Sequence, residues 1–236
     1  MKVLILAGGY GTRIYPYSRT IPKPLIRIDG KPIIEHIIGI YVKYGFKDFT
    51  IATGYKGEEI NKNFHKKKFR DLKIDCVDTG KDTMTGGRIL LLKKHLNKTF
   101  LMTYGDGLAN VNINKLLKFH RENSGLATLT AVRPPARFGE IIINKDLSVR
   151  TFKEKPQASK GRINGGFFVM EPEIINYIKN FKTSLEREPL EKLSSQKKLF
   201  AFKHNGFWQC MDTIRDKIHI EEQIKLNNGA YPWLIK

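Results

Sequence analysis

The chain has 236 residues, of which 41% are hydrophobic and 28% charged, and a chain of this length buries a core without disulfides or metals. Its two cysteines, Cys76 and Cys210, are too few for a disulfide framework or a zinc site. No apolar run approaches the roughly 20 residues of a membrane span. The short run at Val3–Leu6 stops at a glycine pair, as a buried strand would. We therefore expect a cytoplasmic protein without a membrane partner.

The net charge of +19 is compatible with a nucleic-acid partner, with small anionic substrates, or with lysines on solvated faces. The lysines are spread along the chain, and their densest run is Lys66–Arg70. No helix-turn-helix or RNA-binding aromatic pattern surrounds this run, which favours a solvated helix end over a binding patch. We expect no specific nucleic-acid partner.

The first half of the chain alternates between apolar runs of strand length and segments with helical spacing. The expected strands are residues 3–6, 49–53, 72–77 and 100–104, and the expected helices are residues 33–42, 58–68 and 89–96. Crossover connections between such strands imply a Rossmann-like, mostly parallel α/β sheet flanked by helices.

After about residue 125 the strand-like segments come closer together. The expected strands are residues 126–132, 140–143, 148–152 and 165–170, and the expected helices are residues 172–180, 188–196 and 214–226. No repeat, low-complexity segment or linker divides the chain. These features indicate one domain over residues 1–236, with a small β extension.

A glycine-rich loop, Ala7–Arg13, follows the first expected strand. It is not a dinucleotide fingerprint, since Ile14 replaces the third glycine, and no Gly-Lys-Ser/Thr closes it as a P-loop. Glycines let main-chain N–H groups approach phosphate oxygens, and Arg13 adds a forked cation. Open α/β sheets bind ligands at such strand ends, so phosphate binding is favoured over a structural turn. Further on, two prolines hold Lys23 on a stiff segment.

Together, Leu6–Arg13 and Pro22–Leu25 resemble the signature of the sugar nucleotidyltransferase family, and further matches run through the chain. These motifs look most like those of the glucose-1-phosphate cytidylyltransferase branch. They are Asp78–Gly80, Met84–Arg88, Tyr104–Gly107, Glu154–Pro156, Asn164–Phe168 and Phe207–Thr213. The resemblance implies the nucleotide-diphospho-sugar transferase fold, with a nucleotide-binding part over about residues 1–125 and a sugar-binding part over about residues 126–236.

The resemblance also implies a role for each matched position. The catalytic residues would be Arg13, Lys23, Asp106, Lys155 and Asp212. The nucleotide would contact Leu6, Ala7, Gly8, Gly9, Gly11, Thr12, Arg13, Lys23, Thr85, Arg88 and Gly105. The sugar phosphate would contact Tyr104, Gly139, Glu154, Lys155, Asn164 and Gly165. From the residues alone, Lys155 and Arg88 are as well explained by exposure to solvent, and Tyr104 by a place in the core.

In the family, carboxylates at the positions of Asp106 and Asp212 bind Mg²⁺, an ion that prefers few carboxylates plus phosphates and waters. Asp106 lies between two glycines at the end of an expected strand, whereas Asp212 could instead cap the last helix before Thr213. The nucleophile would be a sugar phosphate oxygen, which is already anionic and needs no general base. Alignment and charge neutralisation would supply the catalysis.

The resemblance implies CTP and glucose 1-phosphate as substrates, Mg²⁺ as cofactor, and CDP-glucose for polysaccharide biosynthesis as product. Two alternatives stay open: a relative that uses GTP, dTTP or UTP with mannose or heptose 1-phosphate, and a non-catalytic regulatory or nucleic-acid-binding relative. The second is disfavoured because both aspartates, Arg13 and Lys23 are present. Residues 61–78 form a shorter stretch than the cytidylyltransferases have, which leaves the sugar pocket and a homo-oligomer in question.

Overall fold

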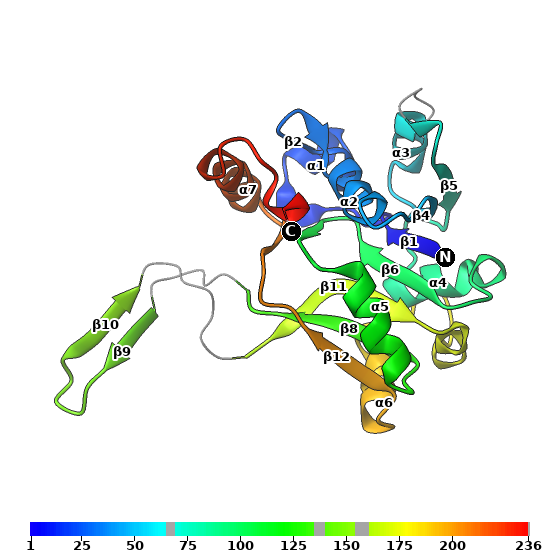
Figure 1. Cartoon of the computed structure of the whole chain (residues 1–236). Helices are drawn as coiled ribbons and strands as arrows, with labels where there is room; N and C mark the ends of the chain where they lie inside the picture. Colours follow the sequence, from blue (N-terminus) through cyan, green and yellow to red (C-terminus); the bar gives the residue numbers. More distant parts are fainter. Residues whose placement is uncertain (65–68, 135–139, 154–160, 236) are drawn as a thin grey trace.

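The computed structural model describes residues 1–64, 69–134, 140–153 and 161–235. A seven-stranded sheet in the order β12-β8-β11-β6-β1-β4-β5 forms its centre (Figure 1). These strands are β1 (Lys2–Leu6), β4 (Asp48–Thr53), β5 (Lys73–Asp78), β6 (Phe100–Tyr104), β8 (Ala127–Val132), β11 (Ile163–Met170) and β12 (Leu199–Lys203). Four of the six neighbouring pairs are parallel, so the expected mostly parallel α/β sheet is confirmed.

Helices contribute to a hydrophobic core on each face of this sheet. One cluster includes α2 (Ile33–Val42), α5 (Ile113–Glu122) and α7 (Ile214–Leu226), and the other includes α4 (Thr85–Leu91) and α6 (Glu188–Ser195). Strand β1 supplies both clusters, with side chains that alternate between them and are fully buried: Val3 and Ile5 in the first, Leu4 in the second. A strand covered on both faces is apolar throughout, which explains the unbroken run that begins the sequence.

Several elements differ from the sequence-based expectations. Helix α4 begins at Thr85 rather than at residue 89, and the expected helix at residues 172–180 is a 3₁₀ helix, η5 (Pro172–Tyr177). Helix α5 was not expected; Asn112 caps it by accepting a hydrogen bond from the Lys115 N–H at 2.9 Å. Helix α3 (Gly57–Phe64) begins one residue before the expected helix at residues 58–68, and residues 65–68 of that expected helix fall outside the described residues.

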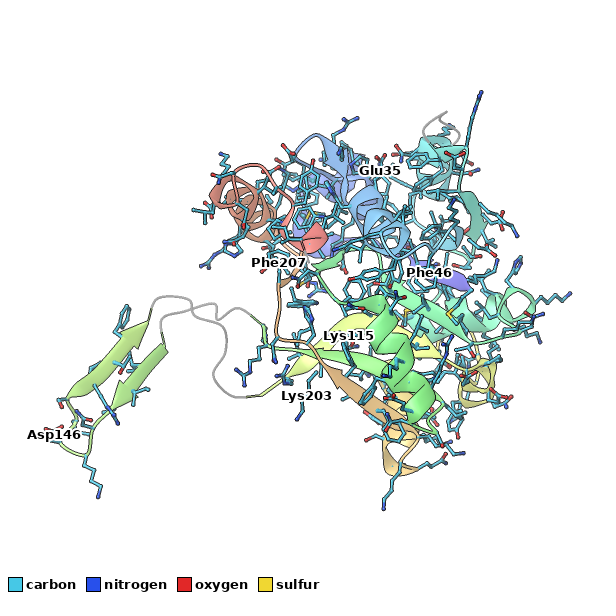
Figure 2. The ribbon with its side chains drawn as sticks, in the orientation of Figure 1. Glu35, Phe46, Lys115, Asp146, Lys203 and Phe207 are labelled. Atoms are coloured by element: carbon cyan, nitrogen blue, oxygen red, sulfur yellow. The ribbon has the colours of Figure 1, made fainter. Side chains whose placement is uncertain are left out.

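The second half of the chain contributes β8, β11 and β12 to the central sheet. Only β9 (Glu140–Ile143) and β10 (Val149–Lys153) form the expected β extension, an antiparallel hairpin. The hairpin projects away from the rest of the protein in Figure 1, and Figure 2 shows Asp146 at its tip. Of the second half of the chain, only the hairpin at residues 140–153 therefore corresponds to the expected small β extension.

The basic run of residues 66–70 falls partly outside the described residues, since residues 66–68 are not among them. Phe69, the one aromatic in the run, packs against Phe64 with ring centroids 5.0 Å apart, so it faces the protein. None of the helices within the described ranges is long and apolar enough to cross a membrane.

The order of the strands defines where a ligand can bind. From β1 the chain builds outward through β4 and β5, then returns to place β6 on the opposite side of β1. The connections that leave β1 and β6 therefore diverge, and they open a crevice at the carboxyl ends of these two parallel strands. Ligands of open α/β sheets bind at such a switch point.

Candidate active site

A cleft of about 580 Å³ opens at the carboxyl ends of β1 and β6. Every described residue that the sequence predicted for nucleotide, sugar phosphate or metal lines it. They are Leu6, Ala7, Gly8, Gly9, Gly11, Thr12, Arg13, Lys23, Thr85, Arg88, Tyr104, Gly105, Asp106, Asn164, Gly165 and Asp212. The predicted residues Gly139, Glu154 and Lys155 lie outside the described residues.

The glycine loop forms one wall of the cleft and runs close to neighbouring chain. Gly11 adopts a left-handed backbone conformation, with φ of 65°, and precedes the short 3₁₀ helix η1 (Thr12–Ile14). A Cβ at Gly11 would lie 3.0 Å from the Cβ of Lys23. Glycine therefore lets the loop turn tightly around the base of the Lys23 side chain.

Arg88 lies beneath the glycine loop, where it is only 4% exposed. Its Nη1 donates hydrogen bonds to the Thr53 carbonyl (2.8 Å), the Thr79 hydroxyl (2.6 Å) and the Gly80 carbonyl (3.0 Å). Its Nη2 donates to the Gly8 carbonyl at 2.9 Å. The alternative of a solvent-exposed arginine is therefore wrong: Arg88 joins the ends of β4 and β5 to the glycine loop.

Asp106 and Asp212 come together through a pair of short strands that the sequence did not predict. Strand β13 (Trp208–Cys210) pairs with β7 (Gly107–Ala109), and Cys210 lies opposite Gly107. The Met211 N–H then donates to the Asp106 carbonyl at 2.9 Å. Because the two aspartates flank this pairing, their carboxylates reach the same side of the cleft.

The alternative role of Asp212, as a helix cap, is excluded by the residues that follow it. Thr213 is the N-cap of α7, and it forms a capping box with Asp216. The Asp216 carboxylate accepts hydrogen bonds from the N–H groups of Thr213 (2.8 Å) and Asp212 (3.0 Å). These bonds satisfy the start of the helix and leave the Asp212 carboxylate available to the cleft.

Lys23 joins the two aspartates. Its Nζ lies 2.6 Å from Asp106 Oδ2 and 2.6 Å from Asp212 Oδ1, and its side chain is 12% exposed. Burial by itself would lower the pKa of Lys23, but the two carboxylates outweigh it and leave the pKa above its ordinary value. Arg13, which is largely exposed, reaches Asp212 Oδ2 at 2.8 Å. Lys23 is thus a firmly protonated cation at the centre of the site.

The two carboxylates fit a divalent cation of the magnesium type. Oxygens of Asp106 and Asp212 already converge on one cationic atom, the Lys23 Nζ. Mg²⁺ needs only one or two carboxylates when phosphates and waters complete its shell. Among the described residues no group of three or more His, Cys, Asp or Glu side chains could hold a metal, so a richer protein site is not found there.

Cys210 also lines the cleft, next to the aspartates, and its surroundings disfavour a nucleophilic role. Burial, reinforced by the negative charges of Asp106 and Asp212, raises the pKa of the Cys210 thiol to about 12. The thiolate is the reactive form of cysteine, and it is scarce at neutral pH under these conditions. The site therefore holds cations and carboxylates rather than an activated nucleophile.

The opposite wall carries the residues predicted for the sugar. Gly166 has φ of 81°, and a Cβ there would lie 2.7 Å from the Tyr104 ring. The Asn164 Oδ1 accepts the Gly166 N–H at 2.9 Å, and the Trp208 indole N–H donates to the Gly165 carbonyl at 2.8 Å. These bonds hold the irregular stretch of β11 at residues 164–166, where the strand register shifts, against Tyr104, and Asn164, Gly165 and Gly166 line the cleft.

Glu186 is a residue of the cleft that the sequence did not predict. Its carboxylate accepts hydrogen bonds from the hydroxyls of Tyr104 (2.6 Å), Thr85 (2.6 Å) and Ser184 (2.7 Å). No local pattern distinguishes it among the 23 Asp and Glu residues of the chain. Only the folding of its loop against β6 and α4 brings it to the site.

Comparisons with known proteins agree with this geometry. A model of the nucleotidyl transferase family matches residues 2–223. The glucose-1-phosphate cytidylyltransferase of Salmonella typhimurium (strain LT2) is 42% identical over an alignment of 256 positions, which covers 99% of this chain and 98% of that protein. The probable glucose-1-phosphate cytidylyltransferase of Bacillus subtilis (strain 168) is 38% identical and covers 100% of both chains.

A solved structure extends the likeness to three dimensions. HddC from Yersinia pseudotuberculosis, crystallised in complex with GMP-PN, superimposes with a TM-score of 0.75 and 25% identity, covering 94% of this chain and 99% of that one. The family match spans the glycine loop, Lys23, Asp106 and Asp212. The chain therefore belongs to the nucleotidyl transferase family.

Proposed function

We propose that this protein transfers the cytidylyl group of CTP to glucose 1-phosphate, giving CDP-glucose and pyrophosphate. The observation that carries the proposal is the convergence of Lys23 and Arg13 on the Asp106–Asp212 carboxylate pair beside a glycine loop. The choice of cytosine and glucose is supported by the full-length relatives that bear this activity in their names.

In the proposed reaction, an oxygen of the sugar phosphate attacks the α-phosphorus of the triphosphate. The bond from the α-phosphorus to the bridging oxygen breaks, and pyrophosphate leaves with that electron pair. The attacking oxygen is anionic at neutral pH, so the site needs no general base. Its task is to hold the two substrates in line and to neutralise charge, which accounts for most of the catalysis of such transfers.

The described residues divide this task. Main-chain N–H groups of residues 8–12 would hold triphosphate oxygens, and Arg13 and Lys23 would neutralise the departing pyrophosphate. Asp106 and Asp212 would hold Mg²⁺, which when bound neutralises phosphate charge between the two substrates. Lys155 and Glu154, which the sequence assigned to the sugar phosphate, stay predictions.

We further propose that residues 1–125 hold mainly the nucleotide and residues 126–236 mainly the sugar. In support, all the described residues predicted for the nucleotide come from the first part, and Asn164 and Gly165 come from the second. Tyr104 is an exception, since it belongs to the first part and lies against Gly166 of β11 in the second.

A substrate panel tests the proposal. Pyrophosphate release is measured with CTP, UTP, dTTP, GTP and ATP, each against glucose, mannose and galactose 1-phosphates. We expect CTP with glucose 1-phosphate to give the highest kcat/KM, because a site that pairs with the 4-amino group of cytosine leaves its own groups unpaired against uracil. If another triphosphate surpasses CTP by about tenfold or more, the cytidylyl assignment fails and the transferase assignment remains. Asp212→Asn serves as the inactive control.

A further inference from the structure

Glu186 connects the two walls of the cleft. Its Oε1 accepts a hydrogen bond from the hydroxyl of Tyr104, at the end of β6, and its Oε2 accepts from the hydroxyl of Thr85, the first residue of α4; both bonds are 2.6 Å long. The Ser184 hydroxyl adds a bond of 2.7 Å to Oε2. A single carboxylate therefore joins a strand end to a helix start, two elements far apart in the chain.

Thr85 and Tyr104, the two residues that Glu186 connects, lie on the sides of the cleft proposed for different substrates. Thr85 belongs to the predicted nucleotide contacts, whereas Tyr104 lies beside the predicted sugar contact Asn164. The Asn164 Nδ2 donates to the Tyr104 oxygen at 3.4 Å. Polar groups thus run without interruption from Asn164 through Tyr104 and Glu186 to Thr85.

The Glu186 carboxylate is held in the ionised form that accepts these hydrogen bonds. Burial by itself would raise the pKa of Glu186, but its three hydroxyl donors outweigh burial and leave the pKa below its ordinary value. The carboxylate therefore stays ionised at neutral pH, and it accepts the hydrogen bond from the Tyr104 hydroxyl.

On the basis of the proposed function, we propose that Glu186 is a positioning residue for the transfer reaction. By holding the Tyr104 phenol and the first turn of α4 at a fixed separation, it sets the distance between the sugar phosphate and the triphosphate. In a reaction that depends on alignment, a displacement of about 1 Å costs on the order of a hundredfold in rate.

The loop that carries Glu186 has anchors of its own, so the carboxylate is not required to hold it in place. The Met84 N–H donates to the Phe181 carbonyl at 2.9 Å, and the Gly87 N–H donates to the Thr183 carbonyl at 3.1 Å. The Leu185 N–H donates to the Thr85 hydroxyl at 2.9 Å. A glutamine at position 186 keeps these bonds and the size of the side chain, so the variant is expected to fold.

Glu188 provides a matched control on the same segment. It pairs with Lys179 at 2.7 Å and Lys192 at 3.7 Å, and it does not line the cleft. Glu188→Gln removes the same charge from the same stretch of chain without touching Tyr104 or Thr85. We expect its kcat and both KM values to match the wild type.

The test uses the full-length protein, with the substrate pair that the panel finds best. We expect Glu186→Gln to lower kcat by at least about tenfold and to raise the KM of both substrates, with an unchanged melting temperature. In a Tyr104→Phe background, Glu186→Gln should no longer raise the sugar phosphate KM. In a Thr85→Val background it should no longer raise the triphosphate KM, because the partner through which it acts is gone.

Three outcomes would overturn the positioning role. The first is a Glu186→Gln variant with wild-type kinetics, and the second is a variant altered only in melting temperature. The third is full additivity with Tyr104→Phe and Thr85→Val, which would mean that Glu186 acts through neither. A wild type that turns over no substrate pair in the panel would refute the proposed function, and the role of Glu186 with it. An active wild type with one of the three outcomes above would refute the role of Glu186 alone.

Discussion

The ammonium of Lys23 lies 2.6 Å from Asp106 Oδ2, and it makes a contact of equal length to Asp212. The lysine therefore lies where two carboxylates would share a divalent cation. A metal ion bound there would compete with this ion pair for the same oxygens. On the proposed function, Lys23 would exchange the carboxylates for phosphate oxygens when metal and triphosphate bind; the glycine loop proposed for the triphosphate packs against the base of its side chain.

The first prediction concerns this competition. Lys23→Met removes the cation that the two carboxylates share and leaves only Arg13, which pairs with Asp212. Mn²⁺ should therefore bind more tightly in the absence of nucleotide, measured by the electron paramagnetic resonance signal of free Mn²⁺. Turnover should fall by about 10- to 100-fold, the equivalent of a hydrogen bond to a charged group of about 1.5–3 kcal/mol. Lys217→Met is the control, because Lys217 pairs with Glu221 on α7 outside the cleft. Unchanged Mn²⁺ affinity in Lys23→Met would contradict the competition.

The second prediction distinguishes the proposed metal ligands Asp106 and Asp212 from Asp216, which caps helix α7. Asp106→Asn and Asp212→Asn should each lower turnover by orders of magnitude while the fold persists, because no third carboxylate among the described residues joins the pair. Asp216→Asn should instead cost about 1 kcal/mol of stability through the capping box and leave the metal dependence of turnover unchanged. Magnesium titrations of turnover and thermal melts distinguish the two patterns. Near-normal activity in Asp106→Asn or Asp212→Asn would refute the metal site.

The third prediction uses two adjacent glycines. A Cβ at Gly8 would collide with the guanidinium of Arg88, whereas a Cβ at Gly9 meets nothing within 4 Å. Gly8→Ala and Arg88→Met should each lower the free energy of unfolding by about 3 kcal/mol, because they leave buried carbonyl groups without their donor. Gly9→Ala should stay within about 0.5 kcal/mol of the wild type. Urea unfolding midpoints provide the comparison, and equal losses for Gly8→Ala and Gly9→Ala would show that Arg88 does not anchor the loop.

The fourth prediction follows from the thiol of Cys210, whose pKa of about 12 in the folded protein lies above its ordinary value of 9.0 because of burial and the nearby aspartates. Between these values the unfolded chain releases a proton that the folded protein keeps, so stability falls as the pH rises above about 9. Cys210→Ala removes this contribution. The stability of the variant relative to the wild type should therefore increase with pH, by at most about 1.4 kcal/mol per pH unit.

Two measurements on Cys210 check this expectation. Urea unfolding at pH 8, 9 and 10 gives the difference in slope, and parallel curves for wild type and variant would contradict it. Turnover of Cys210→Ala at pH 7.5 should remain close to that of the wild type, because the protonated thiol takes no part in the transfer. A large loss of turnover would reopen a covalent role for the cysteine.

Local patterns in the sequence predicted much of the fold and the chemistry of the cleft. The apolar run at Val3–Leu6 predicted a buried strand, and the alternation of strands and helices predicted the α/β sheet. The glycines of Ala7–Arg13 predicted a loop at a strand end, and the structure places the loop there; phosphate binding by this loop stays a prediction. These predictions succeed because backbone conformation and burial on one element depend on residues near each other in the chain.

Elements that rely on distant partners were missed. Strands β7 and β13 have three residues each, too few for a visible period, and they exist because they pair with one another. Strands β8 and β11 were expected but not placed in the central sheet, since strand order depends on the path of the crossovers, and β12 was not expected as a strand. The shift of α4 to Thr85 likewise follows from its contacts with the loop at residues 181–185.

The sequence by itself determined which groups are available: two aspartates, a glycine loop, an arginine and a stiffly held lysine. The tertiary structure decided their partners. Lys23 meets Asp106 and Asp212 across 83 and 189 positions of chain. Arg88 became a buried anchor, and Glu186 came to join the two walls of the cleft. Such contacts depend on the strand order and on the β7–β13 pairing, and the free energy that selects those arrangements comes from the whole core rather than from any local stretch of sequence.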